Sequence, residues 1–356
     1  MPKIDFSYNK SINGFNDARI RGLGAEVSAF IEEGLKDKAS QKSAIPWLYN
    51  EEKSNKQTEI ITISEGFDLM DPQSDGDVAK TDKRNVIGQK AISHVIYTKN
   101  IMVTETMMED AYHTLSPDIE LSARAIPDSY WRTRETVAQG AYINGEQSEF
   151  RFRGAKIDTT TYDGMPLFSA NHKYGNDEVG RVHGTQSNLF YINLGEGYTA
   201  GNLAEVLSAG AAVINQMLNS DGEAQDFDAD TVIVPRGVAT NSFVDKVRRA
   251  IGSEYFPGTA NNDINTQNGA WNFVPLSFWK PDEAELMIMS QDAKKMMKSM
   301  FYNRVNLGIN VYETPGTGTL NWRARTRFGV GHVDYKHVIK IKINPKNTDG
   351  LTELKI

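Results

Sequence analysis

Two β-branched segments separated by a long polar stretch constrain the fold of this chain most strongly. Residues 58–64 and 91–98 are β-branched and partly alternating, which predicts strands. Residues 68–88 between them are rich in Asp, Lys, Gly and Pro, so the pair predicts an extended hairpin over 57–103. An isolated hairpin is only marginally stable in water. The pattern therefore favours pairing with a partner, and an ordinary surface hairpin or edge strand is the alternative.

The first part of the chain, residues 1–56, has too few apolar side chains for a core of its own. A short helical stripe at 25–35 precedes an apolar cluster at 47–49. A short helix with an aromatic anchor needs another surface to pack on. We interpret 1–56 as an arm, with an extension packed on its own domain as the alternative. The polar N-terminus does not resemble a signal peptide, and no apolar stretch is long enough to predict a transmembrane helix.

Residues 104–144 predict a long helix with an interruption. Ser116 is a favourable N-cap, and Pro117 would then occupy the first helical position, where its missing N–H costs nothing. Pro127 predicts a kink or a restart. The sequence Asn144-Gly145 predicts the C-terminal end. Residues 145–202, which follow, show little regular pattern and predict a long loop.

The second half of the chain combines an α/β segment with a β-rich end. An apolar i, i+3, i+4 pattern predicts a helix over 203–218, followed by a strand at 231–234 and a helix at 242–251. Three further strands are predicted at 306–312, 320–327 and 336–344. In the last strand Ile alternates with Lys, which predicts one buried and one solvated face. The fold class is therefore α+β.

The charge balance argues against a dedicated nucleic-acid reader. The formal net charge is −7, whereas such proteins carry clustered Lys and Arg. A protein container that encloses nucleic acid without binding it tightly remains compatible with this charge. Locally, residues 321–346 contain many basic side chains and only one acidic side chain, that of Asp334. That stretch would suit enclosed DNA or an acidic neighbour, and a solvated sheet face is the alternative.

Motifs of catalysis and metal binding are missing from the sequence. The chain has no cysteine, which excludes disulfides, thiolate metal sites and cysteine nucleophiles. It also lacks HExxH, GxSxG, a P-loop, and a GxGxxG after a strand. The sequence therefore predicts no enzyme, no cofactor and no metal. The alternative from the enzyme class is a hydrolase that uses His172 and Asp163.

Residues 162–172, from Tyr162 to His172, resemble the DG-x-x-LFS-x-x-H segment of the Mu-type (gpT-like) major head subunit of tailed bacteriophages. In that family the segment precedes a Gly/Asn-rich loop, an SNL turn, an amphipathic helix, a DG turn and a strand that reads VVP. The chain has the same order at 175–176, 187–189, 203–218, 221–222 and 232–235. The resemblance extends over about residues 160–250.

This resemblance implies a Hong Kong 97-type capsid fold, and the elements predicted independently fit it. The mapping gives an N-terminal arm at 1–56 and an extended hairpin, the E-loop, at 57–103. The peripheral domain would comprise 104–202 and 321–356, with a spine helix at 116–144. The axial domain would comprise 203–320. The implied function is that of a major capsid protein that assembles into an icosahedral shell around phage DNA.

The resemblance also implies the partners. We expect pentamers and hexamers of this chain, a portal, and a separate scaffolding protein, because the arm is short. The shell would enclose double-stranded DNA without sequence-specific binding and without a membrane. We expect it in the virion, assembled in the host bacterial cytoplasm. An encapsulin-like nanocompartment shell is the alternative within the same fold.

Seven residues are candidates for contacts between subunits, chosen from the arm, the hairpin tip and the 162–172 segment. They are Trp47, Asp71, Lys80, Lys83, Arg84, Phe168 and His172.

Overall fold

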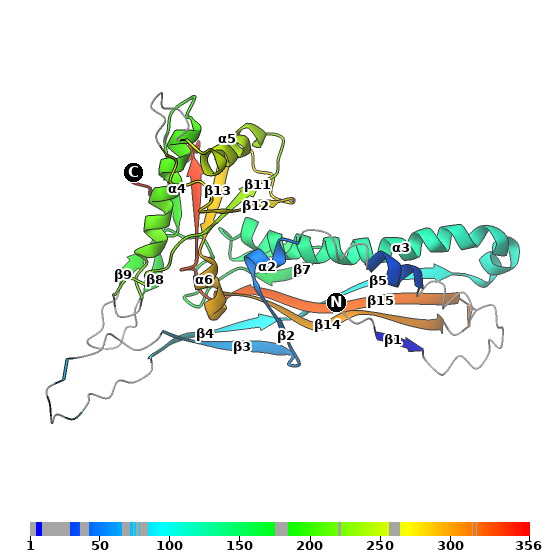
Figure 1. Ribbon diagram of the computed structural model, residues 1–356. Coiled ribbons are helices and arrows are strands. Elements are labelled where there is room, and N and C mark those ends of the chain that lie inside the picture. The colour runs from blue at the N-terminus through cyan, green and yellow to red at the C-terminus, as the bar shows by residue number, and fades with distance from the viewer. Residues whose placement is uncertain are drawn as a thin grey trace.

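The computed structural model describes residues 5–8, 29–35, 43–65, 72–73, 75, 78, 85–174, 184–219, 222–255, 264–314, 316–317 and 319–356. In this part of the chain, a peripheral lobe lies along a long helix and an axial lobe lies at the C-terminal end of that helix (Figure 1). A hairpin extends from the peripheral lobe on the side of the sheet away from the helix. The architecture is α+β, as predicted.

The peripheral lobe is a five-stranded sheet with one long helix on a single face (Figure 1). The order β1-β14-β15-β5 forms the main path, and β2 also pairs with β14. The strands are β1 (Asp5–Tyr8), β2 (Asn50–Lys53), β5 (Val95–Val103), β14 (Ser299–Thr314) and β15 (Thr319–His332). The helix is α3 (Glu105–Ile143).

Helix α3 begins earlier than predicted and is continuous. It starts at Glu105, so Ser116 is not an N-cap, and Pro117 and Pro127 both lie within its 39 residues. A proline in a helix interior removes one backbone hydrogen bond. Packing offsets this cost at Pro127, because Ile126 and Tyr130 on either side of it are buried against the sheet.

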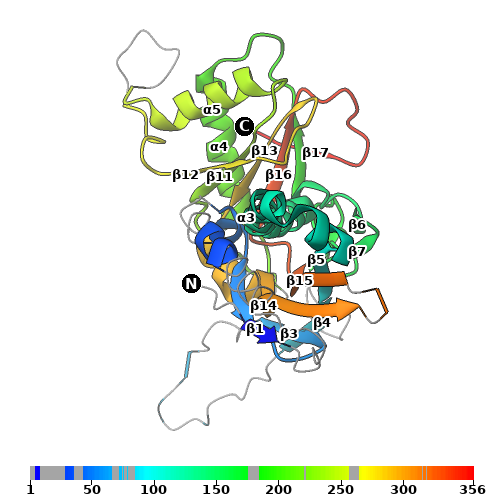
Figure 2. The ribbon, with the colours of Figure 1, turned by 90° about the vertical axis from the view of Figure 1, so that its right-hand side faces the viewer.

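The axial lobe is a six-stranded sheet in the order β12-β11-β13-β16-β10-β17, with α4 and α5 on one face (Figure 2). Its other face packs toward the end of α3. The helices are α4 (Ala200–Asn215) and α5 (Asn241–Gly252), close to the predicted ones. The strands are β10 (Leu189–Ile192), β11 (Thr231–Pro235), β12 (Asn272–Leu276), β13 (Ala284–Met289), β16 (Val338–Ile343) and β17 (Thr352–Glu353).

The predicted domain boundary at residues 320/321 is wrong because strand pairing divides the chain differently. Strand β14 pairs with β15 along its whole length, which places 299–314 in the peripheral sheet. Strand β16 lies between β13 and β10, and β17 also pairs with β10, so 338–353 belongs to the axial sheet. Strand β10, predicted to be peripheral, is axial as well. The chain therefore crosses between the lobes several times.

The hairpin is shorter than predicted. Strand β3 (Thr58–Glu65) pairs antiparallel with β4 (Asn85–Ser93), and the chain then turns at His94 into β5. Residues 95–103 pair with β15 instead and belong to the peripheral sheet. The hairpin is therefore 58–93. His94 closes its base, because its Nδ1 lies 3.0 Å from the carbonyl oxygen of Gln57.

The predicted loop at 145–202 contains two further short hairpins. Their strands are β6 (Glu149–Phe152) with β7 (Ala155–Asp158), and β8 (His172–Tyr174) with β9 (Gly184–Gln186). Strands this short lack the alternation that makes a strand recognisable. The remaining elements are a helical stretch over 29–35, the short helix α2 (Ile45–Leu48), α6 (Gln291–Ala293) and the π-helical turn η1 (Lys294–Lys298).

Candidate functional site

The hairpin β3–β4 has very little core of its own. Among its side chains that the structure describes, only Lys90 and Ile92 are buried. Ile60 is 62% exposed and Val86 is 49% exposed. Apolar side chains on a projecting two-stranded element gain stability only when something covers them. The hairpin is therefore a surface that suits contact with another molecule.

The root of the hairpin is fastened to the rest of the chain at Lys90. The Lys90 Nζ donates to Asp158 Oδ2 at 2.5 Å and to Thr160 Oγ1 at 2.7 Å. Burial raises the pKa of the Asp158 carboxyl, but hydrogen bonds from Lys90 and Thr160 outweigh this and hold it below its ordinary value. The carboxylate form is thus favoured, and the ion pair fixes the direction in which the hairpin leaves the lobe.

Two glycines of β15 allow the end of β4 to lie close to β15. A Cβ at Gly329 would lie 2.7 Å from the carbonyl oxygen of Ser93, and one at Gly331 would lie 2.8 Å from Ile92 Cγ1. Both distances are shorter than a carbon atom tolerates. Glycine at these positions therefore lets the hairpin root lie directly on the sheet.

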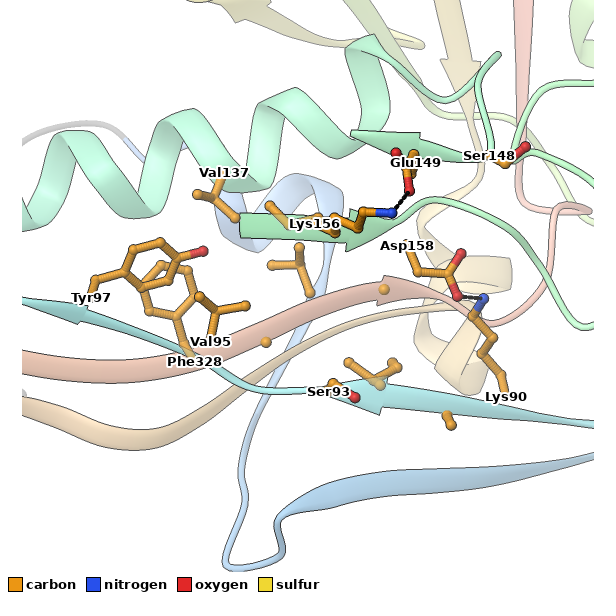
Figure 3. Close-up of a pocket in the computed structure, with 16 residues that line it drawn as sticks. Lys90, Ser93, Val95, Tyr97, Val137, Ser148, Glu149, Lys156, Asp158 and Phe328 are labelled. Atoms are coloured by element: carbon orange, nitrogen blue, oxygen red, sulfur yellow. Dashed lines mark hydrogen bonds and ion pairs between the residues drawn. The ribbon is translucent and has the colours of Figure 1, made fainter. Parts of the chain in front are cut away.

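A cavity of about 400 Å³ lies between the hairpin root, β15 and the β6–β7 hairpin (Figure 3). Its wall is apolar at Val137, Tyr97 and Phe328 and charged at the opposite end, where Lys90 and Asp158 pair (Figure 3). No nucleophile with an adjacent base lines this cavity in the described residues. It thus resembles a packing gap beneath the hairpin more than a catalytic pocket.

The junction between the lobes is held by buried ion pairs. Lys340 of β16 is 3% exposed, and its Nζ lies 2.7 Å from Glu146 Oε1 and 3.0 Å from Glu285 Oε2. Glu146 also pairs with Lys342 at 2.7 Å, and Trp279 Nε1 donates to Glu285 at 2.6 Å. The prediction that the Lys face of this strand is solvated is therefore wrong. The end of α3 covers that face, and carboxylates compensate the lysines.

A second buried polar group lies at the same junction. The hydroxyl of Tyr142 lies 2.8 Å from Ser299 Oγ and 3.0 Å from His337 Nε2, and His332 Nδ1 lies 3.0 Å from the same Ser299 oxygen. Burial lowers the pKa of His332 to about 3 and that of His337 well below its ordinary value. Both imidazoles are therefore neutral near pH 7, and this hydrogen-bonded group is fully enclosed.

The recognisable 162–172 segment folds around Asp163 and His172. Asp163 Oδ2 lies 2.8 Å from His172 Nδ1, while His172 Nε2 lies 3.1 Å from the carbonyl oxygen of Leu167. The imidazole also stacks on Tyr335 with ring centroids 3.8 Å apart. Both ring nitrogens are engaged and the side chain is 0% exposed, so the pair offers no base to a substrate. It fixes the loop instead.

The candidate contact residues fall into three groups. Trp47 is 38% exposed at the end of α2 and is available to a neighbour. Phe168 and His172 are buried within the subunit, so neither side chain is presented at the surface. The other four candidates, Asp71, Lys80, Lys83 and Arg84, lie outside the described residues.

The sequence analysis missed Lys90 and Lys340, which the structure places at the hairpin root and at the lobe junction. A single Lys among β-branched residues carries no signal of burial.

The basic stretch 321–346 does not form one surface. Arg323 and Arg325 are exposed on the sheet face away from α3, whereas Lys336 and Lys340 are buried.

Within the described residues, no group of His, Asp or Glu side chains could hold a metal ion, and no helix is long and apolar enough to span a membrane.

Comparison with known proteins gave matches among solved structures only. No protein-family model matches the chain, and no curated protein matches its sequence. A structure of Mycobacterium phage Patience is similar over 100% of this chain and 96% of that chain, with a TM-score of 0.46 and 12% identity. The mature capsid of bacteriophage PhiM1 is similar over 86% and 89%, with a TM-score of 0.49 and 10% identity. The capsid of a native GTA particle is similar over 86% and 92%, with a TM-score of 0.48 and 10% identity.

Proposed function

We propose that the chain is the major capsid protein of a tailed bacteriophage, of the Mu type, and that it assembles with copies of itself into an icosahedral shell around the phage genome. The hairpin carries this proposal. Its two strands have eight and nine residues, and only Lys90 and Ile92 are buried among the side chains described. Coverage by neighbouring molecules would bury the apolar side chains that the chain itself leaves exposed on this element.

The finer features of the proposal follow from the resemblance of residues 160–250 to the head subunit family. The shell would be built from pentamers and hexamers, completed by a portal and formed on a separate scaffolding protein in the bacterial cytoplasm. The DNA would be enclosed without sequence-specific contacts, which agrees with a net charge of −7. A nanocompartment shell would use the same surfaces, so the contents of purified particles distinguish the two functions. Packaged DNA supports the phage capsid, and protein cargo supports the nanocompartment.

Removal of the hairpin tip tests the proposal. Glu65 and Asn85 are directly paired, so a two-residue Asn-Gly turn can replace 66–84 and close the hairpin without a change of register. We expect this variant to remain folded but to form no closed shells in electron micrographs and sedimentation. Normal shells from it would refute the role of the hairpin.

The β8–β9 hairpin provides a matched control. Tyr174 and Gly184 are paired at its end, so the same Asn-Gly turn can replace 175–183. We expect this excision to leave shell formation intact. Circular dichroism of both variants verifies that neither excision unfolds the subunit. Only a loss specific to the first variant supports the proposal.

A further inference from the structure

Asn268 and Gly269 form an exposed pair in the turns that precede β12 in the axial lobe. Gly269 has a φ of 74°, a left-handed conformation that favours glycine, so the turn itself requires that the residue after Asn268 lacks a Cβ. A Cβ built at Gly269 would meet no atom within 4 Å apart from its chain neighbours, so the backbone lies in open space. The backbone nitrogen that follows the Asn268 side chain is therefore unshielded.

Neither the Gly269 nitrogen nor the Asn268 amide is held by a hydrogen bond. Among the described residues, nothing accepts from the Gly269 N–H, and the Asn268 side chain has no partner. The turn is closed instead by the Asn268 N–H, which donates to the carbonyl oxygen of Asn265 at 3.1 Å, and by the Ala270 N–H, which donates to that of Gln267 at 3.3 Å. The side-chain amide and the nitrogen beside it therefore give up no hydrogen bond when they react with each other.

Contacts with the two helices of the lobe hold this turn in its exposed position. Asn265 Nδ2 donates to the carbonyl oxygen of Ala250 at 2.7 Å, which fastens the turn to the C-terminal end of α5. Gln267 Nε2 donates to Ser208 Oγ of α4 at 2.9 Å, and Trp271 Nε1 donates to Gln267 Oε1 at 2.6 Å. The exposed pair is thus a fixed feature of the folded lobe.

The chain also contains the same two residues in a closed environment, at Asn144 and Gly145. Asn144 Nδ2 donates to the carbonyl oxygen of Gly140 at 2.8 Å, and the Gly145 N–H donates to that of Tyr142 at 3.1 Å. Gly145 is buried, and a Cβ there would lie 2.9 Å from Phe168 Cδ2. Both groups that are free in the axial turn are therefore engaged at the end of α3.

We propose that Asn268 is a site of spontaneous deamidation, at which its amide is converted to a carboxyl group. The Gly269 nitrogen attacks Asn268 Cγ and forms a C–N bond, and the side-chain nitrogen leaves as ammonia with the proton of the Gly269 N–H. The five-membered succinimide then takes up water and opens at either carbonyl, which yields aspartate or isoaspartate. Water is the only co-reactant. Such an intramolecular reaction is favoured where the two groups are positioned to meet.

The conversion changes both the charge and the backbone of the axial lobe. Each event adds one negative charge to a chain whose formal net charge is already −7. Isoaspartate also lengthens the backbone by one methylene group shortly before β12, which is an edge strand of the axial sheet. This inference goes beyond the proposed function and does not depend on assembly.

The test compares deamidation in the folded full chain with deamidation in the same chain unfolded in urea, both at mildly alkaline pH. The chain has three Asn-Gly pairs, at 13–14, 144–145 and 268–269, and they fall on different tryptic peptides, so mass spectrometry follows each pair separately. The pair at 13–14 lies outside the described residues. For each pair, the rate in the folded chain is divided by the rate in urea, which removes the effect of the neighbouring sequence. We expect this ratio to be at least about tenfold higher for Asn268 than for Asn144, because two hydrogen bonds must break before Asn144 reacts.

Two variants show whether the reaction belongs to Asn268. Labelling with an isoaspartyl methyltransferase detects the isoaspartate product on the peptide that contains residue 268. Asn268→Gln keeps an exposed amide, but cyclisation would then require a six-membered ring and is slower, so we expect the label on this peptide to disappear. Asn241→Gln is the matched control, because Asn241 is also exposed but is followed by Ser242, and it should leave the label unchanged.

A ratio for Asn268 that is no higher than that for Asn144 would overturn this inference, as would a label that persists in Asn268→Gln. Neither result bears on the proposed function, which is judged separately by whether the unmodified chain forms shells.

Discussion

Substitution of Lys340 tests how much the buried ion pairs at the lobe junction contribute to the free energy of unfolding. Lys340→Met keeps the length of the side chain and removes the ammonium group that lies 2.7 Å from Glu146 and 3.0 Å from Glu285. Loss of one partner of a buried ion pair costs about 3–5 kcal/mol, because the remaining charge is buried without compensation. Glu146 keeps Lys342 as a partner at 2.7 Å. We therefore expect the lower end of that range, about 3 kcal/mol.

The unpaired Glu285 should account for most of this loss. Adding Glu285→Gln removes the uncompensated charge while the amide oxygen still accepts from Trp279 Nε1, so the double variant should regain about 2 kcal/mol. Lys342→Met is the matched control. Its side chain is 21% exposed, and we expect a loss of about 1 kcal/mol or less.

The assay is urea unfolding monitored by circular dichroism. All variants are made in the chain whose residues 66–84 are replaced by the Asn-Gly turn, so that the protein stays unassembled. The reasoning is refuted if Lys340→Met costs no more than Lys342→Met, or if the double variant is no more stable than the single one.

Three further predictions concern the buried groups. Because the pKa values of His332 and His337 are lowered in the folded protein, the unfolded chain binds protons more readily than the folded one. The contribution of these two residues to the free energy of unfolding is therefore complete above about pH 6.5. It decreases by up to about 2.7 kcal/mol per pH unit as the pH drops toward 3. Urea midpoints that do not change between pH 7 and pH 5 would contradict this. Gly210→Ala would place a Cβ 2.4 Å from Ile288 Cδ1, and should cost about 1–3 kcal/mol in thermal unfolding. Phe168→Ala should destabilise the subunit by about 3–5 kcal/mol, since the side chain is 1% exposed, and an unchanged melting temperature would show that the site collapses.

Elements with a strong local pattern could be predicted from the sequence. The helix at 200–215 has a full apolar stripe and a capping box at Thr199, and its predicted position differs by a few residues. The buried strand β11 and the helix α5 were predicted equally well. In each case local periodicity and packing on the sheet agree, so the pattern alone identifies the element.

Features that depend on distant partners could not be predicted. Residues 91–98 look like one strand, yet the chain leaves the hairpin at His94, because β15 offers a longer partner to the residues that follow. Lys340 looks solvated from its alternation with Ile, and only Glu146 and Glu285, distant in sequence, make it buried. Pro117 looks like a helix start, although the helix begins at Glu105.

The sequence predicted which kind of surface would be functional, a projecting hairpin, but it identified only some of the residues involved. The hairpin was recognised because β-branched runs surround a long polar tip. The pairing of residues 95–103 with β15 was not predicted, since nothing in these residues indicates which strand they join. Phe168 and His172 stood out in the sequence because of the motif, and the structure places both inside the subunit.

The position of β16 has a consequence for the timing of folding during synthesis. This strand, Val338–Ile343, lies in the middle of the axial sheet between β13 and β10, although it is made after both of them. The ribosome must therefore release about residue 343 before the axial lobe can close, and until then β10 and β13 lack their common neighbour. A chain interrupted earlier exposes two strand edges and lacks Lys340. Such an interrupted chain therefore cannot form the complete axial sheet.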